Sequence, residues 1–312
     1  MGKMIDGVWL QADDIGAKHN GNFKRTQSLL RNRVSADPKA KFPAESGRYH
    51  LYIAWNCPWA HRTVLMRALK GLQNHIGLSV CAPRRTDQGW VFDPGNGYRD
   101  DLFGADAMHE IYAKGVDGYT GRVTVPVLYD TKTDSIVSNE SAEIMRMLNS
   151  AFNTYGNDAD FYPKDLRTQI DQWNKRIYDG LNNAVYRAGF AETQQAYDEG
   201  VNDVFETLDG VEVQLKKTKF LTGDIFTEAD VRLFPTLARF DNGYYSAFKC
   251  NRNRLTDFPN LWRYAREIYH MPNVKETVFF DIYRSGYHSP SIKRNVHGIV
   301  PIAPDISWDN TY

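Results

Sequence analysis

The residues best suited to chemistry are Cys57 and Pro58, which stand where a strand pattern meets a helix pattern. The β-rich run 49–55 ends just before them, and apolar residues at helical spacing follow from Leu65 to Leu72. Because proline suits the first position of a helix, we expect Cys57 at a helix N-terminus, among backbone N–H groups without an intrahelical partner. The positive end of the helix dipole lowers a thiol pKa there, so the pattern predicts a reactive thiolate.

Cys57 has no resolving partner in its motif, because Ala60 occupies the place of the second cysteine of a Cys-x-x-Cys pair. A lone thiolate cannot close an internal disulfide, so a redox cycle through Cys57 requires a small external thiol. The alternative is that Cys57 is only a small buried residue. A position before a proline at a strand-to-helix turn favours the reactive interpretation. Cys81, in a strand pattern, and Cys250, in a polar loop, are expected to be structural or incidental.

Composition limits the class of protein. The 312 residues suffice for two domains, each with its own core. The 38 basic and 38 acidic residues balance, which argues against a nucleic-acid partner. Three cysteines make no disulfide framework, and we see no apolar run of signal or transmembrane length. We therefore expect a soluble, cytoplasmic protein that does not bind membranes.

The histidines predict no metal site, because their spacing is not that of metal ligands. His61 lies one turn into the helix after Cys57 and could assist the thiolate electrostatically. A helix-surface histidine without a role is the favoured interpretation, since the helix terminus already activates the thiol.

The elements around Cys57 follow the order β-α-β-(α)-β-β-α, which is the order of a thioredoxin-like domain. They are a strand at 49–55, a helix at 58–72, a strand at 78–82, a short helix at 106–114, strands at 123–129 and 135–137, and a helix from about residue 139. The first βαβ unit favours a parallel pair, and the short polar turn between the last two strands indicates an antiparallel hairpin. The long connection 83–121 is of a kind that is usually functional.

Pro126 interrupts a strand pattern, although proline removes a hydrogen-bond donor from a strand. A cis peptide bond between Val125 and Pro126 at the strand edge resolves this conflict. The backbone N–H and C=O of Val125 could then face a peptide-like ligand. Base rates favour an ordinary trans proline, and the surrounding order of strands shifts the expectation to cis.

Glu140 and Ser141 carry a carboxylate and a hydroxyl at the expected start of the helix after the hairpin. Residues there can serve simply as an N-cap. Glu140 adds a charge that could meet an amino group, and Ser141 with its N–H could hold a carboxylate. The pair fits a ligand with both an ammonium and a carboxylate group, such as the γ-glutamyl end of glutathione.

From residue 160 onward the apolar pattern has helical spacing, which predicts an all-α second half. Thr227 and Asp230 have the form of a capping box, with Asp in place of the usual Glu, and open one of these helices. Pro259 begins another. The tail after Phe280 is expected to be irregular.

Together these features resemble a cytosolic glutathione transferase, and longer motifs resemble the glutathionyl-hydroquinone reductases, the Xi class. The resemblance runs from about residue 40 to the C-terminus. The motifs that carry it are residues 56–62, 121–128, 137–144, 232–241 and 248–251.

The resemblance implies a glutathione transferase fold, an α/β plus all-α architecture. An N-terminal thioredoxin-like domain would precede a C-terminal helical-bundle domain. The implied parts are an N-terminal extension (1–46), a thioredoxin-like glutathione-binding domain (47–155), an all-helical substrate and dimerisation domain (160–280) and a C-terminal tail over the cleft (281–312). A homodimer is also implied.

The resemblance further implies a reaction. The Cys57 thiolate would attack the sulfur of a glutathionyl-hydroquinone and release the hydroquinone. Glutathione, the co-substrate, would then attack the Cys57–glutathione disulfide and leave as glutathione disulfide. By motif, the glutathione contacts are Trp90, Arg122, Val125, Glu140 and Ser141.

The family also places tyrosines over the aromatic substrate, and Tyr186 is the first match. Near the C-terminus the sequence departs from the usual Tyr-x-Ser-His spacing, so the second tyrosine is either Tyr283 or Tyr287. The physiological quinone is not specified by these motifs.

Two other functions stay open. One is an omega-like dehydroascorbate reductase or general deglutathionylase, which uses the same cysteine on other substrates. The other is a non-catalytic, glutathione-transferase-like interaction module, against which the intact Cys57, Glu140 and Ser141 argue.

Overall fold

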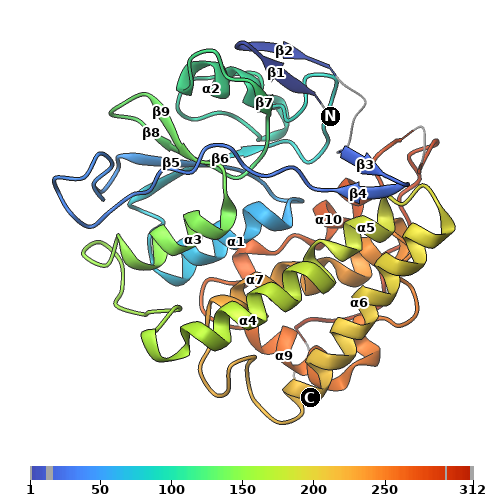
Figure 1. The fold of residues 1–312 in the computed structure, drawn as a ribbon. Helices are drawn as coiled ribbons and strands as arrows, with labels where there is room; N and C mark the ends of the chain where they lie inside the picture. The colour runs from blue at the N-terminus through green and yellow to red at the C-terminus, as the bar shows by residue number, and fades with distance from the viewer. Residues whose placement is uncertain (1, 12–16, 292–293, 310–312) are drawn as a thin grey trace. The chain divides into compact units, whose positions relative to one another are not determined.

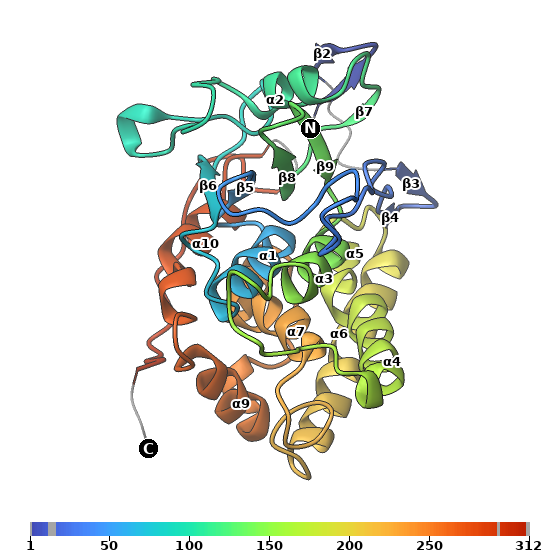
Figure 2. The same ribbon diagram turned by 90° about the vertical axis from the view of Figure 1, so that its left-hand side faces the viewer.

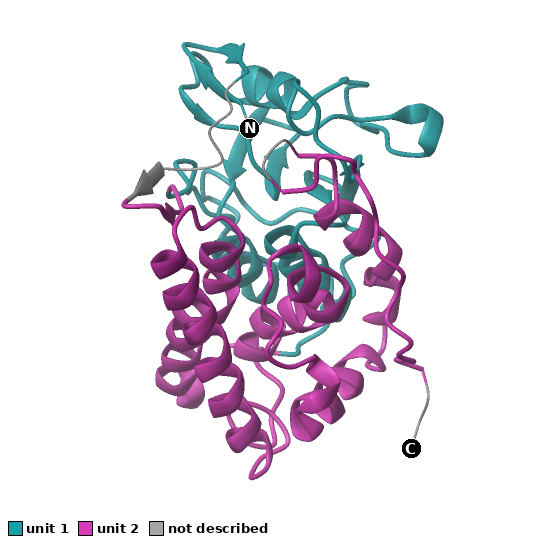
Figure 3. Cartoon of the chain, turned by 90° about the vertical axis from the view of Figure 1, so that its right-hand side faces the viewer, with its two compact units in different colours: residues 1–15, 27–159 teal, residues 16–26, 160–312 magenta. Residues whose placement is uncertain are grey.

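The structure is a computed structural model that describes residues 2–11, 17–291 and 294–309 (Figure 1). The chain divides into two compact units, which Figure 3 shows in different colours. Unit 1 comprises residues 1–15 and 27–159, and unit 2 comprises residues 16–26 and 160–312. A short segment near the N-terminus therefore belongs with the C-terminal half of the chain.

Unit 1 is built on a four-stranded sheet with helices on both faces. Its elements are β5 (Tyr49–Ala54), α1 (Pro58–Leu69), β6 (Ile76–Cys81), α2 (Met108–Gly115), β8 (Val127–Asp130), β9 (Ser135–Ser138) and α3 (Ser141–Ser150). The strand order is β6-β5-β8-β9, with β5 parallel to β6 and with β8 antiparallel to β5 and β9. Helix α2 covers one face, and α1 and α3 cover the other (Figures 1 and 2). The predicted thioredoxin-like order is confirmed.

The core of unit 1 lies between the sheet and its helices. All six residues of β5 are buried, because this strand pairs on both edges and is covered on both faces. The apolar faces of the two helices on one side are also buried, including Leu65 of α1 and Ile144 and Leu148 of α3. This packing fixes the position of the turn between β5 and α1, where Cys57 lies.

The strand predicted at 123–129 begins later than expected, at Val127. The preceding pair Gly121–Arg122 forms a separate strand, β7, which pairs with the N-terminal segment instead. Pro126 explains the interruption, because it has no N–H to donate to a ladder.

The N-terminal extension contains two hairpins that the sequence analysis missed. β1 (Lys3–Ile5) and β2 (Val8–Leu10) add to β7 in a three-stranded sheet of order β2-β1-β7, and β3 (Ala17–His19) pairs with β4 (Asn22–Lys24). Both turns have positive φ angles at two successive residues, 48° and 78° in Asp6-Gly7 and 50° and 78° in Asn20-Gly21. Asp-Gly and Asn-Gly are the usual pairs for such two-residue turns, so a sequence signal was present.

Unit 2 is helical, and its described residues include the short β3–β4 hairpin. The helices are α4 (Arg167–Ile177), α5 (Ala184–Gly189), α6 (Gln194–Leu215), α7 (Glu228–Arg239), α8 (Tyr245–Ala247), α9 (Pro259–Tyr269) and α10 (Phe280–Tyr287). The capping box at the start of α7 is confirmed, with the Thr227 N–H donating to the Asp230 carboxylate at 2.8 Å. The expectation of an irregular tail from Phe280 is wrong, because Phe280–Tyr287 form α10 and the Tyr283 side chain is fully buried.

Among the helices of the described residues, none has the length and apolarity that a membrane crossing requires.

Candidate active site

Cys57 occupies the N-terminus of α1, as the proline that follows it predicts. It is the N-cap residue, with φ −83° and ψ 115°, and Pro58 is the first helical residue. The Cys57 carbonyl accepts a hydrogen bond from the His61 N–H at 3.0 Å, which starts the helical ladder. Cys57 is 9% exposed, so the protein covers most of this residue.

The thiol of Cys57 faces the backbone of Val125. Its Sγ lies 3.6 Å from the Val125 carbonyl oxygen, and the thiol donates toward that oxygen. The Val125–Pro126 peptide bond is cis, which confirms the prediction. The structure thus brings together two predicted site residues that are 68 positions apart.

Tyr112, in α2, supports this region and was missed by the sequence analysis. Its hydroxyl lies 3.1 Å from the Thr124 carbonyl and accepts from the Thr124 N–H at 3.3 Å and from the Asn139 amide at 3.1 Å. Burial raises the pKa of Tyr112, so the hydroxyl stays protonated and can donate. The side chain therefore ties the residue before Val125 to the residue before Glu140.

Glu140 is the N-cap of α3, and its carboxylate accepts a hydrogen bond from the Ala142 N–H at 3.1 Å. Its own N–H donates to the Ser138 hydroxyl at 3.1 Å. Ser141, the first residue of the helix, is 3% exposed. The ordinary capping role of Glu140 is therefore present, and the predicted ligand contacts of Glu140 and Ser141 stay predictions.

Trp90 and Arg122 lie on two other segments of unit 1. The Trp90 carbonyl accepts from the Met108 N–H at 2.9 Å, and the Arg85 guanidinium carbon lies 5.2 Å from the centre of the Trp90 ring. Arg122 pairs with Lys3 across β7 and β1. These contacts hold each residue in its segment and do not join either one to Cys57.

The expectation for His61 is wrong in one respect. His61 is only 2% exposed and is therefore buried in α1, not placed on the helix surface. The other two cysteines behave as expected for structural residues, because both are buried. Burial raises the pKa of Cys81 well above its ordinary value and that of Cys250 to about 12, so neither is a thiolate near neutral pH.

A tyrosine cluster forms in unit 2 around Tyr287, the last residue of α10. The hydroxyl of Tyr287 lies 2.9 Å from that of Tyr186 in α5 and 2.9 Å from that of Tyr244. Tyr244 ends the π-helical turn Phe240–Tyr244 and was not singled out from the sequence. Phe248 packs against the group, with its ring centre 5.4 Å from those of Tyr186 and Tyr287. Burial raises the pKa of both Tyr244 and Tyr287, so these hydroxyls stay protonated.

Tyr283 has a different environment from Tyr287, one turn away. Its hydroxyl donates to the Thr277 carbonyl at 3.2 Å. The guanidinium carbon of the fully buried Arg239 lies 3.8 Å from the centre of its ring, a cation–π contact. Burial lowers the pKa of Arg239, whereas the nearby phenol groups of Tyr283 and Tyr287 raise it. The net effect is a raised pKa, so the guanidinium stays charged. Of the two tyrosines left open by the sequence, Tyr287 is the one whose hydroxyl contacts that of Tyr186.

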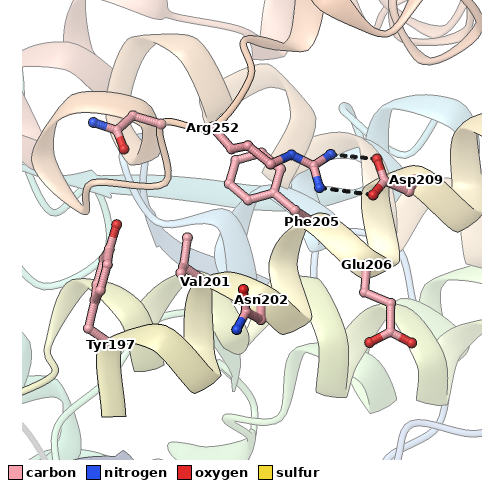
Figure 4. A pocket seen from close by; sticks show the side chains of 8 residues that line it. Tyr197, Val201, Asn202, Phe205, Glu206, Asp209 and Arg252 are labelled. Atoms are coloured by element: carbon pink, nitrogen blue, oxygen red, sulfur yellow. Dashed lines mark hydrogen bonds and ion pairs between the residues drawn. The ribbon is translucent and has the colours of Figure 1, made fainter. Parts of the chain in front are cut away.

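An open hollow of about 520 Å³ lies along α6 (Figure 4). At its rim Arg252 donates two hydrogen bonds to the carboxylate of Asp209, at 2.9 and 2.5 Å. The residues that line it are Tyr197, Val201, Asn202, Phe205, Glu206, Asp209, Asn251 and Arg252. The residues predicted from the sequence to carry the chemistry all lie elsewhere.

Within residues 2–11, 17–291 and 294–309, no three His, Cys, Asp or Glu side chains gather in a way that could hold a metal ion.

Comparison with known protein families shows that two domains of one family match this chain. Residues 56–151 match the glutathione S-transferase N-terminal domain, and residues 194–267 match the glutathione S-transferase C-terminal domain. The two matches fall in unit 1 and unit 2, respectively.

Full-length relatives are also similar. The chain is 46% identical to the glutathionyl-hydroquinone reductase YqjG of Escherichia coli, over 97% of this chain and 95% of the relative. The glutathione-bound structure of YqjG, described as a glutathione transferase homologue, has a TM-score of 0.89 at 45% identity and covers 99% of this chain and 97% of its own. The Xi-class transferase of Natrialba magadii has a TM-score of 0.92 at 40% identity and covers 100% of this chain and 96% of its own.

Proposed function

This chain belongs to the glutathione transferase family, in its Xi class, and from that premise we propose that it is a glutathionyl-hydroquinone reductase. The observation that carries the proposal is Cys57 at the N-terminus of α1, next to the Val125 carbonyl, in a chain whose other two cysteines have raised pKa values. One reactive thiol and an external thiol suffice for the reaction.

In the first step the Cys57 thiolate attacks the glutathione sulfur of the substrate. A sulfur–sulfur bond forms and the carbon–sulfur bond to the ring breaks. The bonding electrons go to the ring carbon, which takes up a proton, so the hydroquinone leaves in reduced form. The two sulfur atoms are oxidised together by two electrons, which balances the reduction of the carbon. The product on the protein is a Cys57–glutathione disulfide.

In the second step free glutathione regenerates the enzyme. Its thiolate attacks the glutathione sulfur of the mixed disulfide, forms glutathione disulfide and releases the Cys57 thiolate. The helix N-terminus suits Cys57 as the leaving thiol, because the positive end of the helix dipole favours a thiolate there. One glutathione is consumed for each hydroquinone released.

We propose that glutathione binds in unit 1, through Trp90, Arg122, Val125, Glu140 and Ser141. Two features support Val125 and Glu140 in this set, whereas Trp90, Arg122 and Ser141 rest on the motif match. The Val125 carbonyl already faces Cys57, as a backbone-bound tripeptide with its sulfur at Cys57 requires. The Tyr112 hydroxyl is hydrogen-bonded to both Thr124 and Asn139, the residues before Val125 and Glu140. The two segments that would bind the middle and one end of the tripeptide are therefore connected.

We propose that the tyrosine cluster of unit 2 contacts the aromatic ring, through Tyr186 and Tyr287, with Tyr244 as their neighbour. Tyrosine offers a ring for packing and a hydroxyl for the phenolic oxygens of the hydroquinone. Tyr287 supports this role better than Tyr283, because its hydroxyl meets that of Tyr186 while the hydroxyl of Tyr283 is bonded to a backbone carbonyl.

We further propose that the enzyme works as a homodimer in the cytoplasm. Light scattering of the purified protein would test the oligomeric state. A mass of one chain at micromolar concentration would contradict it.

The decisive experiment is turnover of glutathionyl-menadiol and a chlorinated glutathionyl-hydroquinone with glutathione, with hydroquinone and glutathione disulfide measured by chromatography. We expect the two products in equal amounts. Dehydroascorbate with glutathione is the parallel assay. Faster turnover of dehydroascorbate would favour the omega-like alternative. Failure to bind glutathione at millimolar concentration would favour a non-catalytic module.

A further inference from the structure

The N-terminal hairpin β1–β2 lies outside the matched transferase domain, which begins at residue 56. It is nevertheless built into unit 1. Lys3 and Met4 pair with Arg122 and Gly121 across β1 and β7, and Met4 is 1% exposed. The Gly7 N–H donates to the Tyr119 carbonyl at 3.1 Å. Strand β1 of the hairpin is therefore the pairing partner of β7, the strand on which Arg122 lies.

The half-buried Trp9, in β2, reaches from this hairpin to a second segment. Its indole ring stacks on the ring of His109 in α2, with centres 4.9 Å apart and planes 16° apart. The indole N–H donates to the Asp87 carbonyl at 3.2 Å. Gly89 packs against the same ring, and a β-carbon there would lie 2.9 Å from it.

The segment that Trp9 touches is the tight turn that leads into Trp90. Thr86 and Gly89 exchange backbone hydrogen bonds at 3.0 and 3.1 Å, and Gly89 has a positive φ of 77°. The Gln88 side chain meets the His109 ring at 3.2 Å. The indole is therefore held against both this turn and α2, and the turn ends at the residue before Trp90.

We propose that Trp9 is a positioning residue for glutathione binding, and that the β1–β2 hairpin holds Trp90 and Arg122, one through each strand, in the arrangement that glutathione requires. This inference rests on the proposed function, which assigns glutathione contacts to those two residues. The hairpin belongs to the binding site as a support, although Trp9 itself touches no substrate.

The test compares Trp9→Phe and Trp9→Ala with Val8→Ala as the matched control. Val8 is the neighbour of Trp9 in β2 and is 62% exposed, so truncating its side chain should remove little packing. Trp9→Phe keeps a ring for stacking and loses the bond to Asp87, whereas Trp9→Ala loses both. Calorimetric titration of each full-length protein with glutathione gives the dissociation constant, and steady-state kinetics at saturating glutathione gives kcat.

We expect Trp9→Phe to raise the glutathione dissociation constant by about twofold to tenfold, the range of one lost hydrogen bond. Trp9→Ala should raise it further, by about tenfold or more, because the stacking is also lost. The value of kcat at saturating glutathione should stay within about twofold of wild type, since Cys57 is untouched. Hydrogen exchange of the amides of residues 86–91 should become faster in Trp9→Ala and stay unchanged in Val8→Ala.

A general loss of stability would lower kcat with the active fraction and leave the dissociation constant unchanged, and that pattern would overturn the inference. Equal weakening of binding in Val8→Ala would also overturn it. If Trp9→Ala does not fold, the dissociation constant of Trp9→Phe decides: a value equal to that of wild type refutes the role of Trp9. If the wild-type protein itself does not bind glutathione, the proposed function fails, and this inference fails with it.

Discussion

The Cys57 sulfur lies 3.6 Å from the carbonyl oxygen of Val125, and the thiol donates toward that oxygen. This geometry belongs to the protonated cysteine, because a thiolate has no hydrogen to donate to a carbonyl. Ionisation removes this contact, and the positive end of the α1 helix dipole then favours the charge.

Cys57→Ser is expected to abolish reductase turnover and to leave the fold intact. A serine hydroxyl can donate to the same carbonyl but does not ionise near neutral pH. After treatment with glutathione disulfide, mass spectrometry should find one glutathione on the wild-type protein and none on the variant. Cys250→Ser is the matched control and should keep both activity and the modification. Wild-type turnover in Cys57→Ser would refute the mechanism.

Glu140→Gln should weaken glutathione binding by about tenfold to a hundredfold, since a charge-assisted contact is worth about 1.5–3 kcal/mol. The glutamine keeps an oxygen for the Ala142 N–H, so stability should change little. Glu140→Ala should weaken binding similarly and also lose about 1 kcal/mol of unfolding free energy, the usual effect of a lost cap. Calorimetry and urea unfolding measure the two effects separately. An unchanged dissociation constant in Glu140→Gln would contradict the assignment.

Tyr186→Phe and Tyr287→Phe should each lower kcat/KM for glutathionyl-hydroquinones by roughly fivefold to a hundredfold, because a buried phenolic oxygen of the substrate would be left without a hydrogen-bond partner, which costs about 1–3 kcal/mol. Turnover of a non-phenolic mixed disulfide of glutathione should change little. Tyr283→Phe serves as the control, because its hydroxyl is bonded to the Thr277 carbonyl. Equal losses on both substrates would show that the tyrosines act on the fold or on glutathione.

Asp230→Ala should destabilise unit 2 by about 3 kcal/mol or more, because several buried groups lose their acceptor together. The Asp230 carboxylate accepts from the N–H groups of Thr227 and Leu221 at 2.8 and 3.0 Å and from the Tyr264 hydroxyl at 2.7 Å. A cap on the protein surface would contribute only about 1 kcal/mol. The urea midpoint measures the difference, with the exposed Glu206→Ala in α6 as the control for a lost carboxylate.

Asp241→Asn tests a pH dependence of stability. Burial raises the pKa of Asp241 to about 6, although its carboxylate accepts from the Leu255 N–H at 2.8 Å. The folded state therefore binds more protons than the unfolded state between about pH 4 and 6, and stability from this group falls as pH rises through that window. The asparagine variant should match wild type near pH 4 and exceed it by about 2–3 kcal/mol at pH 7, since each pKa unit corresponds to about 1.4 kcal/mol. Urea unfolding at three pH values would show the trend, and a constant difference would contradict it.

Much of the local structure followed from short stretches of sequence. Cys57 and Pro58 predicted the start of α1, Thr227 and Asp230 predicted the start of α7, and the hairpin of β8 and β9 followed from a short polar turn. Such features depend on residues within a few positions of one another, so a linear pattern contains them. The hairpin at Asp6-Gly7 was equally local, and its turn signal was present in the sequence but not used.

The sequence by itself determined the thioredoxin-like order, the position of Cys57 at the start of α1 and the resemblance that indicates a reaction. Only the tertiary structure decided that Tyr287 meets Tyr186, 101 positions away, and that Tyr112 and Trp9 support the segments of the candidate site. These relationships depend on which distant segments pack together, and packing is set by the whole buried surface. No spacing along the chain encodes them, because a tyrosine in a buried contact and one on the surface look the same in the sequence.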